Sequence, residues 1–269
     1  PEYPSWERLR KEDLEQAPFL MFEIQSTDGY PIRKLKAPAK PGINRISWDF
    51  DYSELMPFGE NVNINKKSGY PVLPGEYQVT MYLNKDGDLS KLAGPVNFNC
   101  KLLENVTLPA EDRQELVDFQ NQVKVLLSDV YSADEYLKFL NKKIDKIKKA
   151  TKIVSGASQQ LMEKPRDIEL ELAEIEKMIH GDESIAKRSG SQPISLMRRL
   201  NRMAYYMLYN SSSPTETNRK NYRIITDKVQ TIVDRLKQIT DQDITPLEEE
   251  LNDLNAPYTP GRMPEWQPE

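Results

Sequence analysis

Apolar or small side chains recur along residues 116–154 at steps that alternate between three and four residues. A repeat of this kind is typical of a helix that packs lengthwise against other helices. One helix cannot remove so long a stripe from water alone, so partners must come from the rest of the C-terminal half. We expect this helix to begin near Pro109 and to end at Ser155-Gly156. Its stripe is Leu116, Phe119, Val123, Leu126, Val130, Ala133, Leu137, Leu140, Ile144, Ile147, Thr151 and Val154.

Three more helical repeats follow. The second helix is predicted to begin at Pro165 and to end before Gly181, and the third follows the polar loop 181–192. The last begins at Ser213-Pro214-Thr215 and is expected to kink at Pro246. Their apolar stripes are Ile168, Leu172, Ile175 and Ile179, then Leu196, Leu200, Met203 and Met207, then Tyr222, Ile225, Val229, Ile232, Leu236 and Ile239.

Helix lengths and charges favour a three-layer arrangement. At about 1.5 Å per residue, the first and last helices each reach on the order of 60 Å, and the middle two reach about half of that. The first helix starts acidic and ends in a run of lysines, so an antiparallel broken layer and a parallel last helix bring opposite charges together. Arg198, Arg199 and Arg202 would then reach the acidic start. We predict a long antiparallel helical bundle of the up, broken-down, up type, with a four-helix up-down-up-down bundle as the alternative.

Before residue 106 the hydrophobic period changes to two. Alternating runs near 19–24, 32–35, 46–50, 77–83 and 96–102, with turns at Asp28-Gly29 and Asp86-Gly87, predict short strands. Such strands favour an immunoglobulin-like β-sandwich with Trp48 as its central packing residue. The fold class is therefore α+β multidomain. We expect a lead-in segment at 1–18, the sandwich at 19–106, the bundle at 107–256 and a proline-rich tail at 257–269.

Two groups of aromatic and methionine side chains are candidate contact surfaces. The insertion 51–73 is long for a sandwich loop and carries Met56, Phe58 and Tyr70, so it either forms a contact surface or covers a sheet edge. Tyr205, Tyr206 and Tyr209 cluster with methionines on more than one face of the third helix. That cluster suits core packing or a protein interface.

Composition limits the classes of partner. The chain has 269 residues, 38% hydrophobic and 29% charged residues and a net charge of −5, with neither half polarised. Nucleic acid is therefore not an expected partner. No apolar run approaches the roughly 20 residues that cross a bilayer, so we expect no membrane insertion. The first residues, Pro-Glu-Tyr-Pro, lack an initiator Met, which indicates a processed or excised fragment.

Residues that carry chemistry are sparse. His180 is the single histidine and has no ligand-spaced Cys or second His, and Cys100 lies in an alternating run where its thiol is expected to be buried. The oxygen-bearing residues 84–90 have calcium-loop spacing, but no Glu stands at the twelfth place, so a hairpin turn is favoured. No nucleophile elbow or phosphate loop is present. We expect no catalytic residue, no metal and no cofactor.

One family resemblance covers most of the chain. The segments Asn44-Arg45-Ile46-Ser47-Trp48-Asp49 and Pro71-Val72-Leu73-Pro74-Gly75-Glu76-Tyr77-Gln78-Val79 resemble the immunoglobulin-like region near the C-terminus of large bacterial proteins with sortilin-like, BNR-repeat β-propellers. Phe22-Glu23-Ile24 and the start of the last helix at Ser213-Pro214-Thr215 fit the same pattern. Such proteins are often labelled glycosyl hydrolases because of the propeller. The resemblance implies an extracytoplasmic setting (periplasmic, cell-surface or secreted) and an upstream β-propeller as partner. It transfers no functional residue, because the shared positions are packing and turn residues.

The sequence therefore favours a non-catalytic C-terminal accessory or scaffold module of such a β-propeller protein. Its work would be domain packing or protein–protein contact, with other proteins or glycans as further partners. The alternative is a carbohydrate-binding accessory domain of a glycoside hydrolase-like protein, which would use Trp48, Tyr70 or Tyr82 for stacking.

Overall fold

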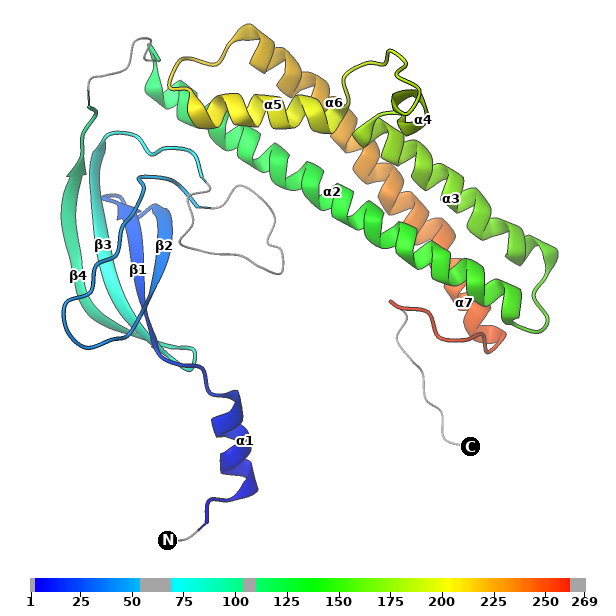
Figure 1. Ribbon diagram of the computed structural model, residues 1–269, viewed down its shortest axis with the longest axis horizontal. Coiled ribbons are helices and arrows are strands. Elements are labelled where there is room, and N and C mark those ends of the chain that lie inside the picture. Colours follow the sequence, from blue (N-terminus) through cyan, green and yellow to red (C-terminus); the bar gives the residue numbers. More distant parts are fainter. Residues whose placement is uncertain (1–2, 54–68, 104–109, 262–269) are drawn as a thin grey trace. The chain divides into compact units, whose positions relative to one another are not determined.

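The computed structural model describes residues 3–53, 69–103 and 110–261 (Figure 1). It is an α+β protein, as predicted, with a small antiparallel sheet followed by a series of helices. The chain divides into two compact units, one of residues 1–120 with 210–213 and the other of residues 121–209 with 214–269.

The first unit contains one described sheet with the strand order β2-β1-β3-β4, antiparallel throughout. Its strands are β1 (Phe19–Ser26), β2 (Pro31–Pro38), β3 (Gly75–Lys85) and β4 (Asp88–Cys100), and helix α1 (Trp6–Leu14) precedes them. The described strands do not confirm the second sheet that an immunoglobulin-like sandwich requires.

The tight turn between β3 and β4 is confirmed. Asp86 and Gly87 connect the strands with φ of +53° and +92°, the conformation that matches the twist of a two-residue hairpin. The Gly87 N–H donates to Oδ1 of Asn84 at 3.3 Å. The residues considered as a calcium loop therefore form a hairpin.

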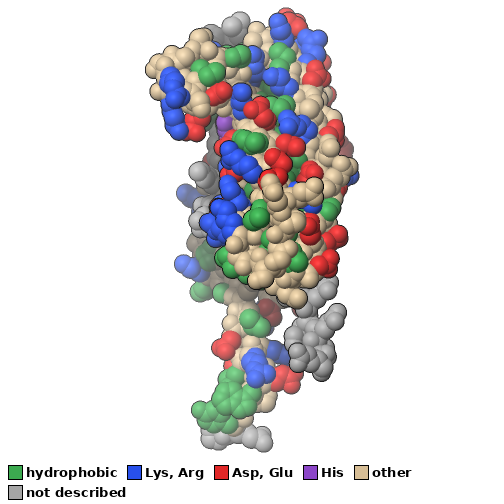
Figure 2. Space-filling model, turned by 90° about the vertical axis from the view of Figure 1, so that its right-hand side faces the viewer, with side chains coloured by type: hydrophobic (Ala, Val, Ile, Leu, Met, Phe, Trp, Pro, Cys, Tyr) green, Lys and Arg blue, Asp and Glu red, His purple; other side chains and the backbone are tan. Residues whose placement is uncertain are grey.

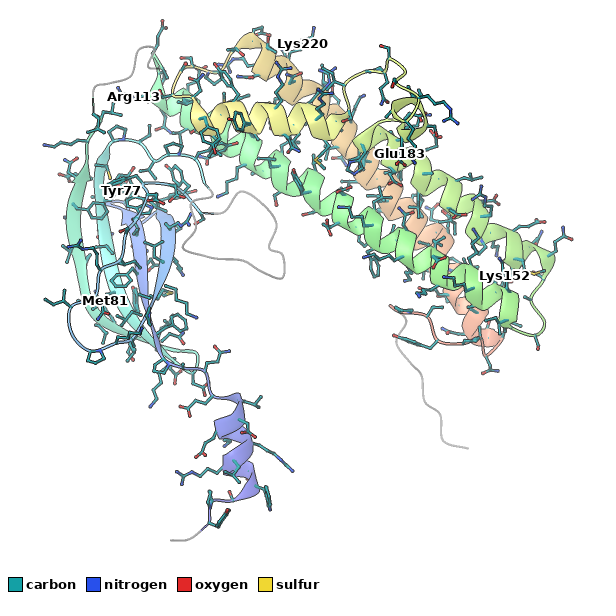
Figure 3. The ribbon with its side chains drawn as sticks, in the orientation of Figure 1. Tyr77, Met81, Arg113, Lys152, Glu183 and Lys220 are labelled. Atoms are coloured by element: carbon teal, nitrogen blue, oxygen red, sulfur yellow. The ribbon has the colours of Figure 1, made fainter. Side chains whose placement is uncertain are left out.

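The core of this unit lies on the sheet. Ile24, Ile32, Leu35, Tyr77 and Cys100 are buried, and Cys100 is a free thiol, as predicted. The ring of Trp48 packs onto this cluster with its centroid 5.8 Å from that of Tyr77 and 5.9 Å from that of Phe98. Figure 3 labels Tyr77 and Met81, which are four residues apart along β3.

The prediction of a strand at residues 46–50 is wrong. This segment lies outside any strand, although Ile46 and Trp48 pack against the sheet core. Phe50 has φ of +56°, which interrupts an extended backbone, and the indole N–H of Trp48 donates to the carbonyl of Asp51 three residues later. The alternating residues Ile46 and Trp48 pack on the sheet core from an irregular segment that pairs with no described strand, whereas Phe50 is 53% exposed.

The long apolar stripe is confirmed. Helix α2 (Arg113–Ile153) contains it, and Figure 3 labels Arg113 and Lys152 near the two ends. All stripe residues from Leu116 to Thr151 are buried, with Phe119 5% exposed and Ile147 0% exposed. Val154, just after the helix, is half-buried.

The remaining helices are α3 (Gln159–His180), α4 (Glu183–Ala186), α5 (Leu196–Tyr209), α6 (Glu216–Gln238) and α7 (Thr245–Asp253), with a π-helix η1 (Ile239–Ile244) between the last two. The predicted stripes of α3 and α5 are buried. Two boundaries differ from the sequence prediction. Helix α3 starts six residues before Pro165, because the Ser158 hydroxyl accepts the Leu161 N–H and caps an earlier turn. The change of phase in the last helix is taken up by η1, ahead of Pro246.

Candidate protein-contact surfaces

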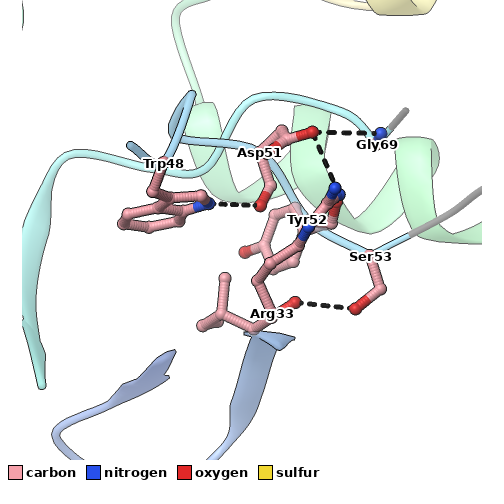
Figure 4. A network of polar contacts seen from close by, with 7 residues as sticks. Arg33, Trp48, Asp51, Tyr52, Ser53 and Gly69 are labelled. Atoms are coloured by element: carbon pink, nitrogen blue, oxygen red, sulfur yellow. Dashed lines mark hydrogen bonds and ion pairs between the residues drawn. The ribbon is translucent and has the colours of Figure 1, made fainter. Parts of the chain in front are cut away.

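A buried ion pair joins β2 to residues 51–52 (Figure 4). Nη1 of Arg33 lies 3.1 Å from Oδ2 of Asp51 and donates to the Tyr52 carbonyl at 2.7 Å. The two side chains are 3% and 2% exposed. The indole N–H of Trp48 donates to the Asp51 carbonyl at 2.9 Å, and the Gly69 N–H lies 3.5 Å from Oδ2. Charges so deeply buried are tolerated only when they are paired and hydrogen-bonded, so this network holds the loop in place.

The first group of candidate contact residues, Met56, Phe58 and Tyr70, does not form an exposed surface among the described residues. Met56 and Phe58 lie outside the described residues. Tyr70 is 1% exposed, so its ring is not a surface in this conformation, which corrects the prediction. Tyr70 lies beside the segment 51–52, and its carbonyl accepts the Tyr52 N–H at 2.9 Å. Burial raises the pKa of the Tyr70 hydroxyl above its usual value.

The same burial bears on the carbohydrate-binding alternative. Sugar stacking requires an open aromatic face. Of the three rings proposed for it, Tyr70 is buried, and Trp48 packs edge-on against both Tyr77 and Phe98. Tyr82 is half-buried, with its hydroxyl 3.4 Å from the Glu23 carboxylate.

The single histidine belongs to a cluster in the second unit. Nε2 of His180 lies 2.6 Å from Oδ1 of Asp134, and Nζ of Lys138 lies 2.9 Å from Oδ2. Burial of Asp134 raises the pKa of its carboxyl, but the hydrogen bonds from Lys138 and His180 outweigh that effect, and the resulting pKa lies below the usual value. The arrangement ties the end of α3 to α2, because each of the two helices supplies a member of the pair.

A groove runs between α2 and the α6–η1 segment. It has a volume of about 590 Å³, and its walls include Ala133 and Tyr136 on one side and Val229 and Val233 on the other. The Tyr136 hydroxyl lies 3.0 Å from Oγ1 of Thr240 in the π-helix. The groove is partly apolar and open, and no described segment fills it.

Helix α5 presents the second group of candidate residues. Tyr205 and Tyr209 are 67% and 71% exposed, and their ring centroids lie 4.7 Å apart. Tyr206 is half-buried between the outer face and the core, so the structure brings only two of the three predicted tyrosines together on the surface. The opposite face of the helix is fully buried through Leu196, Leu200, Met203 and Met207.

Sequence reasoning missed two residues on the same outer face. Arg198 and Arg202 are exposed, and neither guanidinium makes an ion pair or hydrogen bond in the described part of the chain. Their predicted partner was the acidic start of the first helix. The signal that identifies them is spacing: Arg198, Arg202, Tyr205 and Tyr209 stand at i, i+4, i+7 and i+11, which is one face of a helix. We call these four residues the α5 outer stripe.

Other chemistry is limited in the ranges 3–53, 69–103 and 110–261. No group of three or more His, Cys, Asp or Glu side chains in these ranges is placed to hold a metal ion. No helix among these residues combines the length and apolarity needed to cross a bilayer. Acidic and basic side chains both occur across the face of the molecule shown in Figure 2.

Comparison with protein-family models, with curated proteins and with solved structures gives no match for this chain.

Proposed function

We propose that this chain is a non-catalytic accessory or scaffold module whose helical part offers a protein-contact surface on α5. The observation that carries the proposal is the pair Tyr205 and Tyr209, which lie side by side in solvent on a helix whose other face is buried. Tyrosine and arginine are enriched at protein interfaces, because they supply a large contact area at a low cost in conformational entropy. A helix held by its own core keeps those rings in a fixed arrangement.

The order of the contacts along α2 supports the scaffold part of the proposal, in which the helices form a long three-layer bundle. Contacts between α2 and its antiparallel neighbours pair Lys148 with Glu169 and Asp134 with His180. Going back along α2, Tyr131 then meets Asn201 of α5. Partner numbers rise as α2 numbers fall, so α3 and α5 follow one another in the reverse direction, as a broken second layer does.

The last helices fit the third layer of that bundle. Tyr136 of α2 meets Thr240, and Lys143 forms an ion pair with Glu248 at 2.8 Å. Here both numbers rise together, so α2 and the η1–α7 segment run in the same direction. Lys143 and Glu248 are only 10% and 13% exposed, which makes this pair less screened by water than a surface pair.

The parent protein is also part of the proposal. The resemblance of residues 44–49 and 71–79 to the immunoglobulin-like region of sortilin-like, BNR-repeat proteins favours a larger extracytoplasmic protein with an upstream β-propeller. In support, Trp48 and Tyr77 of those segments pack together in the sheet core. We propose that the described sheet is one half of an immunoglobulin-like sandwich in that parent.

Site-specific photocrosslinking in the native host tests the proposed function. A benzophenone amino acid replaces Tyr209 in one variant of the chain and Leu170, which is 50% exposed on α3, in a control variant. We expect discrete protein adducts from position 209 that are absent from position 170. The same weak or empty adduct pattern at both positions would contradict a contact surface on α5.

A further inference from the structure

The α5 outer stripe combines two cations with two aromatic rings. At about 100° per residue, Arg198, Arg202, Tyr205 and Tyr209 fall within an arc of roughly 60° around the helix. The stripe extends over 11 residue steps from 198 to 209, or about 16 Å. The two arginines lie in its N-terminal part and the two tyrosines in its C-terminal part, with their rings tilted by 45° to each other. A ligand that lies along the helix therefore meets charge at one end and aromatic surface at the other.

The arginines of the stripe differ from other arginines nearby in having no side-chain partner in the part of the chain that the structure describes. Nη1 of Arg199, one position away, donates to Oδ1 of Asn221 at 2.9 Å, and Arg223 pairs with Glu216 at 2.8 Å. Arg198 and Arg202 have no such acceptor among the described residues. A guanidinium that is unpaired offers its planar set of donors to a carboxylate, which it binds with two parallel hydrogen bonds.

We propose that the α5 outer stripe binds an acidic helical segment of a partner protein. Two carboxylates one helical turn apart would pair with Arg198 and Arg202, and an apolar side chain one or two turns further would lie on the rings of Tyr205 and Tyr209. The inference rests on the proposed function, because it names the chemistry of the partner at the same surface. The choice of an acidic occupant rests on charge complementarity, since both cations of the stripe are exposed and have no ion-pair partner among residues 3–53, 69–103 and 110–261.

Two other anionic partners fit the stripe less well. Proteins that bind nucleic acid through its backbone contact on the order of 6–10 phosphates, whereas the stripe supplies two cations. Anionic membranes attract clusters of about 4–8 basic residues, again more than the stripe holds.

Binding of a defined peptide to the full chain tests the inference. The probe is a synthetic amphipathic helix with Glu at two positions four residues apart and Leu one turn further, and its partner peptide has Gln at the two Glu positions. Titration calorimetry at low ionic strength measures both. We expect the Glu peptide to bind at least tenfold more tightly than the Gln peptide, and raised salt to remove most of the difference.

Substitutions in the chain test whether the peptide binds to the α5 outer stripe. Arg198→Glu with Arg202→Glu should weaken the Glu peptide at least tenfold, and so should Tyr205→Ala with Tyr209→Ala. All four side chains are exposed, so these variants keep the fold, which circular dichroism verifies. The charge-matched control is Lys91→Glu with Lys228→Glu, two exposed lysines outside the stripe, and it should bind like the parent chain.

Three outcomes overturn the inference. Equal affinity for the Glu and Gln peptides removes the role of charge, and equal loss in the control variant removes the role of the stripe. Tighter, arginine-dependent binding of a 20-nucleotide single-stranded DNA or of phosphatidylserine vesicles assigns the stripe to that polyanion. If adducts form at position 209 while the Glu peptide shows no preference, the contact function stands and only the acidic partner is refuted. If adducts are absent at position 209, the contact function itself fails.

Discussion

Removing the charge of Asp51 is expected to destabilise the first unit strongly. Asp51→Asn keeps the shape of the side chain but removes the negative charge that lies 3.1 Å from the guanidinium of Arg33, which is buried at 3% exposure. Breaking a buried pair in this way costs about 3–5 kcal/mol. For a unit of this size that corresponds to a fall in Tm of roughly 10–20 °C.

The double variant Arg33→Met with Asp51→Asn tests whether the cost of Asp51→Asn comes from the buried charge of Arg33. It removes both charges, so the remaining cost is the loss of hydrogen bonds such as the one from Arg33 to the Tyr52 carbonyl, about 1–3 kcal/mol. The double variant should therefore be more stable than Asp51→Asn alone. Glu23→Gln is the control, because Glu23 and Lys34 form a partly exposed pair at 3.4 Å that contributes no more than about 1 kcal/mol.

Urea unfolding followed by Trp48 fluorescence measures these differences. Trp6 and Trp266 are replaced by Phe, so that the emission comes from the indole that packs on the sheet core. A loss below about 1 kcal/mol in Asp51→Asn, with unchanged Trp48 emission, would refute the reasoning that the pair is desolvated. A double variant less stable than Asp51→Asn would refute the coupling between the two charges.

Three further predictions concern the core, pH and the hairpin. Leu172→Ala, at a fully buried position of α3, should cost about 2–5 kcal/mol in urea unfolding, whereas Leu170→Ala on the exposed face should change stability by less than about 0.5 kcal/mol; similar losses in both would contradict the buried stripe. The pKa of Asp134 is lowered in the folded chain, so its contribution to the free energy of unfolding is present above the unfolded pKa near 3.8 and is lost as pH falls through the lower folded pKa. Unfolding curves from pH 6 to pH 2.5 should therefore show a smaller loss of stability with acid in Asp134→Asn than in the parent chain. An identical pH dependence in the two chains would contradict this. Gly87→Ala should cost about 1–2 kcal/mol in thermal unfolding, because φ is +92° there; the new methyl group would have no atom within 4 Å, so the cost comes from the backbone conformation alone, and a neutral result would contradict the hairpin geometry.

The helical features were predictable because a single physical rule governs them. The stripe from Leu116 to Thr151 follows the period of a helix that buries one side, and every one of those positions is buried. The hairpin at Asp86-Gly87 was equally readable, because few residues accept positive φ at two successive positions. In both cases the local pattern and the tertiary packing demand the same arrangement.

The failures arise where a tertiary contact decides the structure. Nothing local reveals that Asp51 is buried against Arg33, or that Phe50 has φ of +56°, which interrupts an extended backbone at residues 46–50. The burial of Tyr70 is likewise a tertiary feature, in a segment whose backbone bonds to that of Tyr52. At Pro165 the rule that proline begins helices gave the wrong start, because the Ser158 cap was the stronger signal.

The candidate site was predictable only in part. Composition marked the tyrosines of α5 but could not divide them between core and surface. The helical period makes that division, because Met203 and Met207 define the buried side and place Tyr205 and Tyr209 opposite to it. Whether arginines on that face find internal partners depends on neighbouring helices, which the sequence alone does not position.

Hydroxyl-radical footprinting of the intact chain tests the central claim most directly, which is that the helices bury their own apolar stripes and leave the α5 outer face to a partner. Comparison within one residue type removes differences in intrinsic reactivity, so Leu140 is compared with Leu170 and Tyr70 with Tyr209. The exposed fractions are 0% against 50% for the leucines and 1% against 71% for the tyrosines. We expect oxidation at least tenfold slower at Leu140 and Tyr70 than at their exposed counterparts. Equal rates at the two leucines, or a protected Tyr209 in the isolated chain, would contradict the account.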